Sequence, residues 1–344
     1  MDLNEVRRVA KGKLKGTCGV YKVCDGDASR LCMGLKYGDF PGMGGAGSGM
    51  SFRNNFLALE ALRLKMRVVG EPFEVDTSFK FFGKDLAMPI MGASTSGTKF
   101  SIDNAITEGE LSVAVVNGCK EAGSIGWRGD GAATIEYNPN LEACQNAGGH
   151  GVQIFKPVEQ ELLLRRIKDA EDRGILATGV DLDGFGSQNM AKIGYPVFRK
   201  SISDLREIVK STKLPVIFKG IMTVEDADAI MGSGAAGLVV SNHGGRVLDH
   251  TPGTAEVLPQ IVDHVDGNLP VYVDGAIRSG WDALKMMALG ADGVLVGRDL
   301  VRSAVGGGAV GVRLHMEFMH KTLVSAMRMT DCPDLRSIGP RILT

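Results

Sequence analysis

Short apolar runs alternate with helical patterns along most of the chain, and this alternation limits the fold more than any other feature. Eight runs rich in β-branched residues are short enough for strands buried on both faces. They are residues 88–94, 123–127, 151–155, 175–181, 215–220, 237–242, 270–275 and 293–299. Strand–helix units repeated in this way pair in parallel through right-handed crossovers. Eight units over about 250 residues predict an α/β fold, a closed (β/α)8 (TIM) barrel. A doubly wound sheet fits less well, because no G-x-G-x-x-G follows the first strand.

The sequence predicts an N-terminal extension followed by the barrel. Residues 1–50 form the extension, with helical and loop segments and a glycine-rich junction at 42–49, and residues 51–344 form the barrel. Residues 310–327 read as the last, longer outer helix. The extension carries three closely spaced cysteines, whose spacing is not the C-x2-C of common zinc or iron–sulfur sites. We therefore expect reduced thiols and no metal at Cys18, Cys24 and Cys32, with a metal or electron-transfer cluster as the alternative.

Composition excludes several classes of partner. The formal net charge is -1 over 344 residues and no Lys/Arg block is present, so nothing indicates a nucleic-acid or membrane surface. Residues 1–10 lack the apolar region of a signal peptide, and no run of 18 apolar residues exists. We expect a soluble, cytoplasmic protein.

Polar residues follow the apolar runs directly. All strands of a parallel barrel end at one face, which is where barrel enzymes place their sites. Any one of these residues could be structural: Asp181 could cap a helix, Lys219 could be an internal ion-pair partner, and Arg246 could pair with Asp249. Together they favour a functional site, and they are Gln153, Asp181, Lys219, His243, Asp274 and Arg298.

The ends of the seventh and eighth runs have the features of a phosphate site. Barrels commonly bind phosphate there. Gly275 and Gly297 let backbone N–H groups approach an anion closely. Arg278 and Arg298 offer guanidinium groups with the geometry that a dianion requires.

Four motifs carry a resemblance to a known family. They are SNHGGR at 241–246, FKG at 218–220, DGAIRSG at 274–280 and VGRDLV at 296–301. Together they resemble motifs of the FMN-dependent α-hydroxy-acid oxidases and dehydrogenases. That family includes glycolate oxidase, lactate oxidase and flavin-dependent lactate dehydrogenase. The similarity runs from about Gly45 to Ile338 and is weaker before Lys219. There it rests on GAGSGMSFRNN, MPIMGASTSG, GVQIF and ATGVD, the last two resembling the family's Q-L-Y and T-V-D strands.

The resemblance implies FMN-dependent oxidation of a small L-2-hydroxy acid, such as lactate or glycolate, to its 2-oxo acid. It makes His243 the base, Arg246 the substrate-carboxylate ligand, Asp181 the partner of the imidazole, and Lys219 the cation at the flavin N1 edge. It also implies a homotetramer and leaves the electron acceptor open. The remaining implied FMN contacts are Ser94, Thr95, Ser96, Gln153, Ser241 and Asp274, with Gly275, Ala276, Arg278, Gly297 and Arg298 at the phosphate.

These roles also make chemical sense. Oxidising a 2-hydroxy acid needs a base that titrates near neutrality, and histidine is the usual choice. A carboxylate stabilises the imidazolium that forms, and a guanidinium orients the substrate carboxylate. An ammonium beside the flavin favours its reduction.

Three positions depart from the family pattern. Pro41 and Phe155 stand where the family has tyrosines, and Gln188 stands near the place of a second arginine. We expect Phe155 to contact the substrate and Arg128 to supply the missing charge, with Lys192 and Tyr195 as other replacements. The altered site keeps two alternatives open: an activity similar to type 2 isopentenyl diphosphate isomerase, and a non-catalytic FMN-binding barrel. An activity like that of inosine monophosphate dehydrogenase is disfavoured, because the loop after the sixth run has no cysteine.

Overall fold

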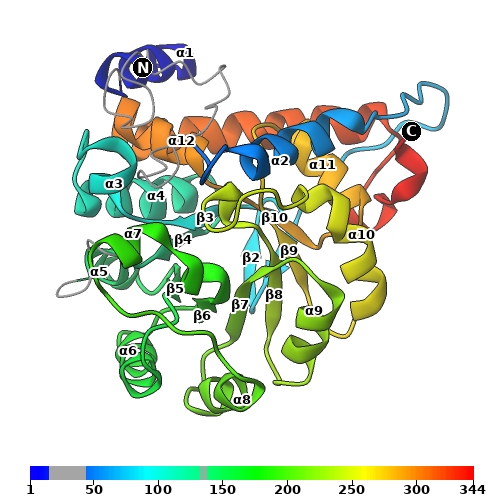
Figure 1. Ribbon diagram of the computed structural model, residues 1–344. Helices are drawn as coiled ribbons and strands as arrows, with labels where there is room; N and C mark the ends of the chain where they lie inside the picture. The colour runs from blue at the N-terminus through cyan, green and yellow to red at the C-terminus, as the bar shows by residue number, and fades with distance from the viewer. Residues whose placement is uncertain (15–43, 132–133, 135–137) are drawn as a thin grey trace.

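A closed barrel of eight parallel strands forms the centre of the computed structural model, which describes residues 1–14, 44–131, 134 and 138–344 (Figure 1). Each run predicted from the sequence overlaps one strand, so the predicted (β/α)8 barrel is confirmed. Neighbouring strands follow the order β10-β3-β4-β5-β6-β7-β8-β9. The strands are β3 (Ile90–Thr95), β4 (Gly126–Gly129), β5 (Val152–Phe155), β6 (Ala177–Asp181), β7 (Val216–Ile221), β8 (Gly237–Val240), β9 (Val271–Val273) and β10 (Gly293–Val296).

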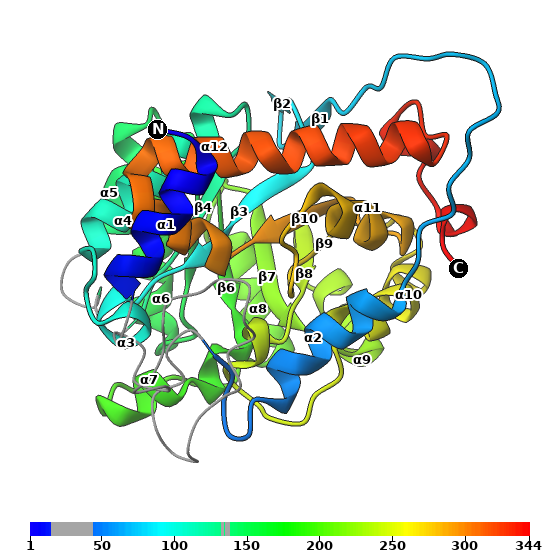
Figure 2. The ribbon, with the colours of Figure 1, turned by 90° about the horizontal axis from the view of Figure 1, so that it is seen from above.

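Helices surround the barrel (Figures 1 and 2). Those that follow the strands are α4 (Glu108–Glu121), α5 (Pro139–Asn146), α6 (Gln160–Asp172), α8 (Ile202–Lys210), α9 (Val224–Met231), α10 (Thr254–Val265), α11 (Gly280–Ala288) and α12 (Arg298–Met329). Helix α12 begins twelve residues before the predicted last helix, at residue 298. Gly307 and Gly308 interrupt it with non-helical backbone angles, so the predicted helix corresponds to its second part. None of the helices in the described ranges is both long and apolar enough to cross a bilayer.

Shorter elements complete the fold. Helix α1 (Leu3–Leu14) packs along α12, where Val6 is fully buried, and α2 (Met50–Ala61) lies beside α10 (Figure 2). Cys18, Cys24 and Cys32 lie outside the described residues. The other short helices are α3 (Thr98–Ile102) and α7 (Gln188–Lys192), with 3-10 turns at η1 (Leu182–Gly186), η2 (His243–Gly245), η3 (Leu335–Ser337) and η4 (Pro340–Ile342).

A hairpin that the sequence did not predict closes the barrel at the end where its strands begin. Strands β1 (Phe79–Phe81) and β2 (Lys84–Leu86) pair antiparallel just before β3. The ring of Phe81 is fully buried and lies 5.8 Å from Trp127 and 5.6 Å from Tyr272, centroid to centroid. The opposite mouth, where the strands end, is left for the site.

The pleat of each strand decides which side chains reach that mouth. Side chains alternate between the two faces of a strand. The core inside the barrel contains Met91, Ala93, Trp127, Val152, Ile154, Ala177, Ile217, Val239, Tyr272 and Leu295. Counting onward in steps of two places Lys156, Asp181, Lys219, Ser241, Asp274 and Gly297 inside the barrel at the ends of their strands. The same count turns Arg128, Gln153 and Phe155 outward, towards the helices.

Candidate active site

A pocket opens at the C-terminal ends of the strands. Backbone and side chains from at least six of the strand ends contribute to its wall. Residues predicted for the site that line it are Ser94, Thr95, Ser96, Lys219, His243, Arg246, Asp274, Gly275, Ala276, Arg278, Gly297 and Arg298. Asp181 and Ser241 are buried behind these residues. Asp181 forms ion pairs with Lys219 and His243, and Ser241 Oγ accepts hydrogen bonds from Lys219 Nζ and the His243 N–H.

A tight turn presents His243 and Arg246 to this pocket. His243, Gly244 and Gly245 have φ angles of 57°, 61° and 77°, which are all left-handed. Glycine adopts this conformation readily, whereas a histidine does so at a cost. A Cβ atom added to Gly244 would clash with a guanidinium nitrogen of Arg298. The side chain of Asn242 accepts a 3.1 Å hydrogen bond from the Gly245 N–H and stabilises the turn.

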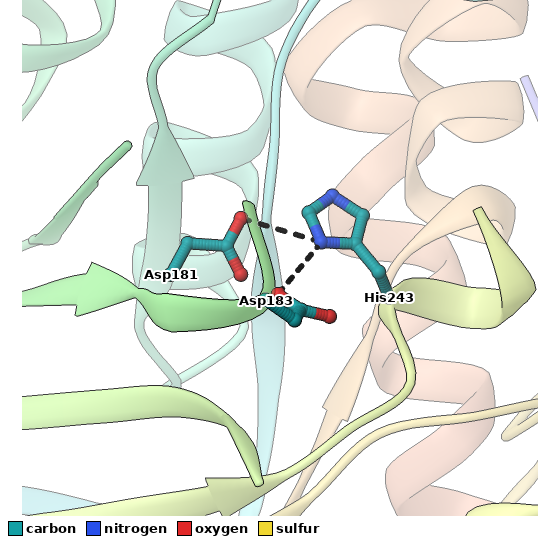
Figure 3. Close-up of side chains that lie close together, drawn as sticks. All are labelled: Asp181, Asp183 and His243. Carbon is teal, nitrogen blue, oxygen red and sulfur yellow. Dashed lines mark hydrogen bonds and ion pairs between the residues drawn. The ribbon is translucent and has the colours of Figure 1, made fainter. Parts of the chain in front are cut away.

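Two carboxylates hold the imidazole (Figure 3). His243 Nδ1 lies 3.1 Å from Asp183 Oδ1 and 3.4 Å from Asp181 Oδ2. The resemblance implied Asp181 as the partner, and the structure adds Asp183 at the shorter distance. Carboxylates at Nδ1 favour the tautomer with its proton there, which leaves Nε2 able to accept a proton.

The two carboxylates have opposite pKa shifts. Burial acts to raise the pKa of Asp181, but attraction to His243, Lys156 and Lys219 outweighs it and holds that pKa well below its usual range. Burial raises the pKa of Asp183, and repulsion from the Asp181 charge adds to this effect. Asp181 is therefore the stronger acid of the pair.

Two lysines complete the charge network around Asp181. Lys219 Nζ donates to Ser241 Oγ at 2.7 Å and lies 3.2 Å from Asp274 Oδ2 and 3.7 Å from Asp181 Oδ1. Burial acts to lower the pKa of Lys219, but Asp274, Asp181 and Asp183 outweigh it and raise that pKa. Lys156 Nζ donates to Asp181 Oδ2 at 2.5 Å. The Lys219 ammonium group therefore stays charged at neutral pH.

The phosphate end contains one arginine more than the sequence predicted. Arg302 lines the pocket together with Arg278 and Arg298. Asp299 joins two of them, accepting from Arg302 Nη1 at 2.7 Å and Arg278 Nε at 3.1 Å. The backbone of Ala276 is left-handed, with φ 58°. Since α12 begins at Arg298, its N–H groups add to the positive end of this pocket.

Unpartnered polar atoms in its wall indicate that the pocket takes a polar ligand. Ser96 Oγ and Asp274 Oδ1 are buried and have no hydrogen-bond partner among the described residues. Both residues line the pocket. A hydroxyl-bearing chain that ends in a phosphate would satisfy Asp274 and place its dianion at the arginines. The residues present therefore fit FMN.

Three predicted site residues neither line the pocket nor belong to the network of Asp181 and Ser241 behind it. Arg128 is fully buried on the outer face of β4, where its guanidinium lies 3.3 Å from Glu108 Oε1 and 3.2 Å from Asn140 Oδ1. It is an internal ion pair and does not face a substrate, so the expected replacement role is wrong. Gln153 and Phe155 are also buried on the outer face. GVQIF shares the letter pattern of Q-L-Y, but Val152 and Ile154 are its inward-facing residues.

Five charged residues of the site escaped the sequence prediction. They are Lys156, Asp130, Asp183, Asp299 and Arg302. Lys156 comes one residue after the run 151–155, and the alternation Val152, Ile154, Lys156 would have located it. Asp183 follows β6 by two residues in a 3-10 turn, and nothing in its sequence context marks it as a partner of His243.

Comparisons with known proteins agree with this site. A family model for FMN-dependent dehydrogenases matches residues 42–192 and 188–344. Glycolate oxidase 3 of Arabidopsis thaliana is 30% identical over 329 residues, covering 86% of this chain and 88% of the relative. The 2-hydroxyacid oxidase of Dictyostelium discoideum is 29% identical over 350 residues, covering 92% and 88%.

Solved structures give the same result. Mandelate oxidase with benzoyl-formic acid superposes with a TM-score of 0.79 at 28% identity, over 100% of this chain and 97% of that one. A mandelate oxidase mutant with the C4a-OH-FMN adduct gives 0.76 at 30% identity, over 88% and 92%. The chain belongs to the FMN-dependent dehydrogenase family. It is an FMN-dependent 2-hydroxy-acid oxidoreductase, and these matches favour that reading over an isomerase-like barrel.

Proposed function

We propose that this protein oxidises a small L-2-hydroxy acid to the 2-oxo acid, with His243 as the base. The observation that carries the proposal is the position of His243: its Nδ1 is held by Asp183 and Asp181 while its ring lines the same pocket as Arg246. A base needs an orienting partner on one ring nitrogen and access to substrate on the other. A guanidinium three residues along binds the carboxylate that every such substrate carries.

The remaining charges support the same reaction. Bound FMN supplies the acceptor for the two electrons that leave the substrate. Lys219, fixed by Ser241 and Asp274, provides a buried positive charge that stabilises negative charge developing nearby. Asp181 and Asp183 stabilise the imidazolium that His243 becomes when it accepts the proton. Gly275, Ala276 and the arginines at 278, 298 and 302 would hold the cofactor phosphate.

Anaerobic mixing of the FMN-loaded protein with a panel of 2-hydroxy acids tests the proposal. At least one acid should bleach the blue absorbance of the flavin, and the matching 2-oxo acid should accumulate in equal amount. The panel should run from glycolate to lactate and mandelate, with both enantiomers where they exist. Flavin that stays oxidised with every acid would refute the proposal and favour a non-catalytic FMN-binding barrel.

A further inference from the structure

The end of β5 directs a lysine into the active-site pocket. Val152 and Ile154 belong to the core inside the barrel, so Lys156 points inward at the mouth. It lines the pocket, and the residue is only 8% exposed. A Cβ atom on Gly184 would lie 2.9 Å from Lys156 Cδ, so the turn after β6 confines the side chain. The ammonium group is therefore a fixed part of the pocket wall.

Lys156 and His243 share one oxygen atom. Lys156 Nζ lies 2.5 Å and His243 Nδ1 3.4 Å from Asp181 Oδ2. The ammonium and the imidazole are thus joined through that oxygen, and both residues line the same pocket. The ammonium has three N–H donors, and Asp181 is its one hydrogen-bond acceptor among the described residues. Two donors are left for a ligand.

Charged N–H donors of this kind suit an anionic substrate. The residue expected to add a second cation, Arg128, lies outside the pocket in an ion pair with Glu108. Lys219 already bonds to Ser241 and Asp274. We propose that Lys156 is a second substrate-binding cation, whose ammonium donates to the carboxylate of the 2-hydroxy acid alongside Arg246. This inference rests on the proposed function, since it takes the substrate to be a 2-hydroxy acid.

A comparison of an acid with its neutral amide tests this role directly. The rates of flavin reduction are measured with the best acid of the panel and with its primary amide, in the wild type, Lys156→Met and Lys156→Arg. Lys156→Met should lower kcat/KM for the acid by about 10- to 100-fold, the effect of losing one charge-assisted hydrogen bond. The amide should change little, and Lys156→Arg should retain most of the activity with the acid. Lys168→Met, which removes an exposed lysine of α6, is the matched control and should behave as wild type.

Equal losses for the acid and the amide would overturn the proposal, because they would show that Lys156 acts only by holding Asp181. Unchanged activity of Lys156→Met with the acid would overturn it too. If the variant loads FMN poorly, binding of the 2-oxo acid to the FMN-loaded fraction, followed by the change in the flavin spectrum, gives the same comparison. Weaker binding in Lys156→Met than in Lys156→Arg supports the proposal, and equal binding contradicts it.

The same measurements separate this inference from the proposed function. A wild type that is reduced by an acid, with no dependence on Lys156, contradicts this inference alone. A wild type that binds 2-oxo acids through Lys156 but is never reduced contradicts the proposed function alone. A wild type that binds no carboxylate ligand contradicts both.

Discussion

At the scale of single residues, the carboxylates around His243 differ in their neighbours. Asp181 lies against the cations Lys156 and Lys219, Asp274 lies against Lys219, and Asp183 lies against the imidazole of His243. Removing one partner of such a buried pair leaves an uncompensated charge. The protonation of Asp183 therefore depends on its neighbours, and it differs from that of Asp181.

Asp183→Asn tests whether this second carboxylate contributes to the reaction. Because the pKa of Asp183 is raised, first by burial and then by the Asp181 charge, it takes up a proton at a higher pH than an ordinary carboxyl group. The benefit of its charge is present above that pKa and is lost as pH falls through it. We expect Asp183→Asn to slow flavin reduction at neutral pH about tenfold or more, with a smaller change of rate on the acid side. The check is the rate of anaerobic bleaching against pH, and a pH profile identical to wild type would contradict it.

At the scale of elements, Arg128 joins β4 to the two helices that flank it. Its guanidinium reaches Glu108 at the start of α4, Asn140 in α5 and the hydroxyl of Thr95 in β3. The Glu108 carboxylate also accepts from the N–H groups of Gly97 and Thr98. This buried cluster therefore fixes the loop after β3, where Ser94, Thr95 and Ser96 line the pocket.

Arg128→Met is predicted to destabilise the fold more than it affects catalysis. It leaves the Glu108 charge buried without its partner, which costs about 3–5 kcal/mol. Chemical denaturation should show this loss, whereas kcat/KM per bound flavin should change little. Arg165→Met removes an exposed arginine paired with Glu161 on α6 and should cost less than about 0.5 kcal/mol. Wild-type stability of Arg128→Met, or a large rise in its KM, would contradict the assignment.

The elements were more predictable from the sequence than the directions of their side chains. All eight strands came from runs buried on both faces, because such runs are short, apolar and bounded by turns. A strand buried on both faces does not show from its sequence which residues face inward. The pairing of GVQIF with Q-L-Y consequently assigned Gln153 and Phe155 to the pocket, whereas both face the helices. His243 and Arg246 were predictable because they follow a strand within one turn. Asp183 was not, because its contact with His243 spans 60 positions.

At the scale of the whole molecule, the FMN site connects segments from both ends of the barrel sequence. Residues after β3 and residues at the start of α12 line the same pocket. A ligand that binds only the folded chain therefore stabilises the whole barrel. The expected homotetramer and the cytoplasmic location remain predictions from the sequence.

FMN should raise the melting temperature of the flavin-free protein, and riboflavin should raise it less. At free FMN about 100 times its Kd, the added stability is about 2.7 kcal/mol. Riboflavin is a matched control because it lacks only the phosphate, which Arg278, Arg298 and Arg302 are placed to bind. Thermal denaturation monitored by circular dichroism measures both shifts. Equal shifts for the two ligands would show that the arginines do not form a phosphate site.

The most direct test of the central claim, that His243 is the base of a 2-hydroxy-acid oxidation, is the rate of anaerobic flavin reduction in His243→Gln. The variant should be compared with wild type at equal FMN content, using the acid that bleaches the wild type fastest. Losing a positioned general base lowers a rate by about 10²- to 10⁴-fold, and the account predicts a loss in that range with FMN still bound. Reduction of His243→Gln at the wild-type rate would contradict it.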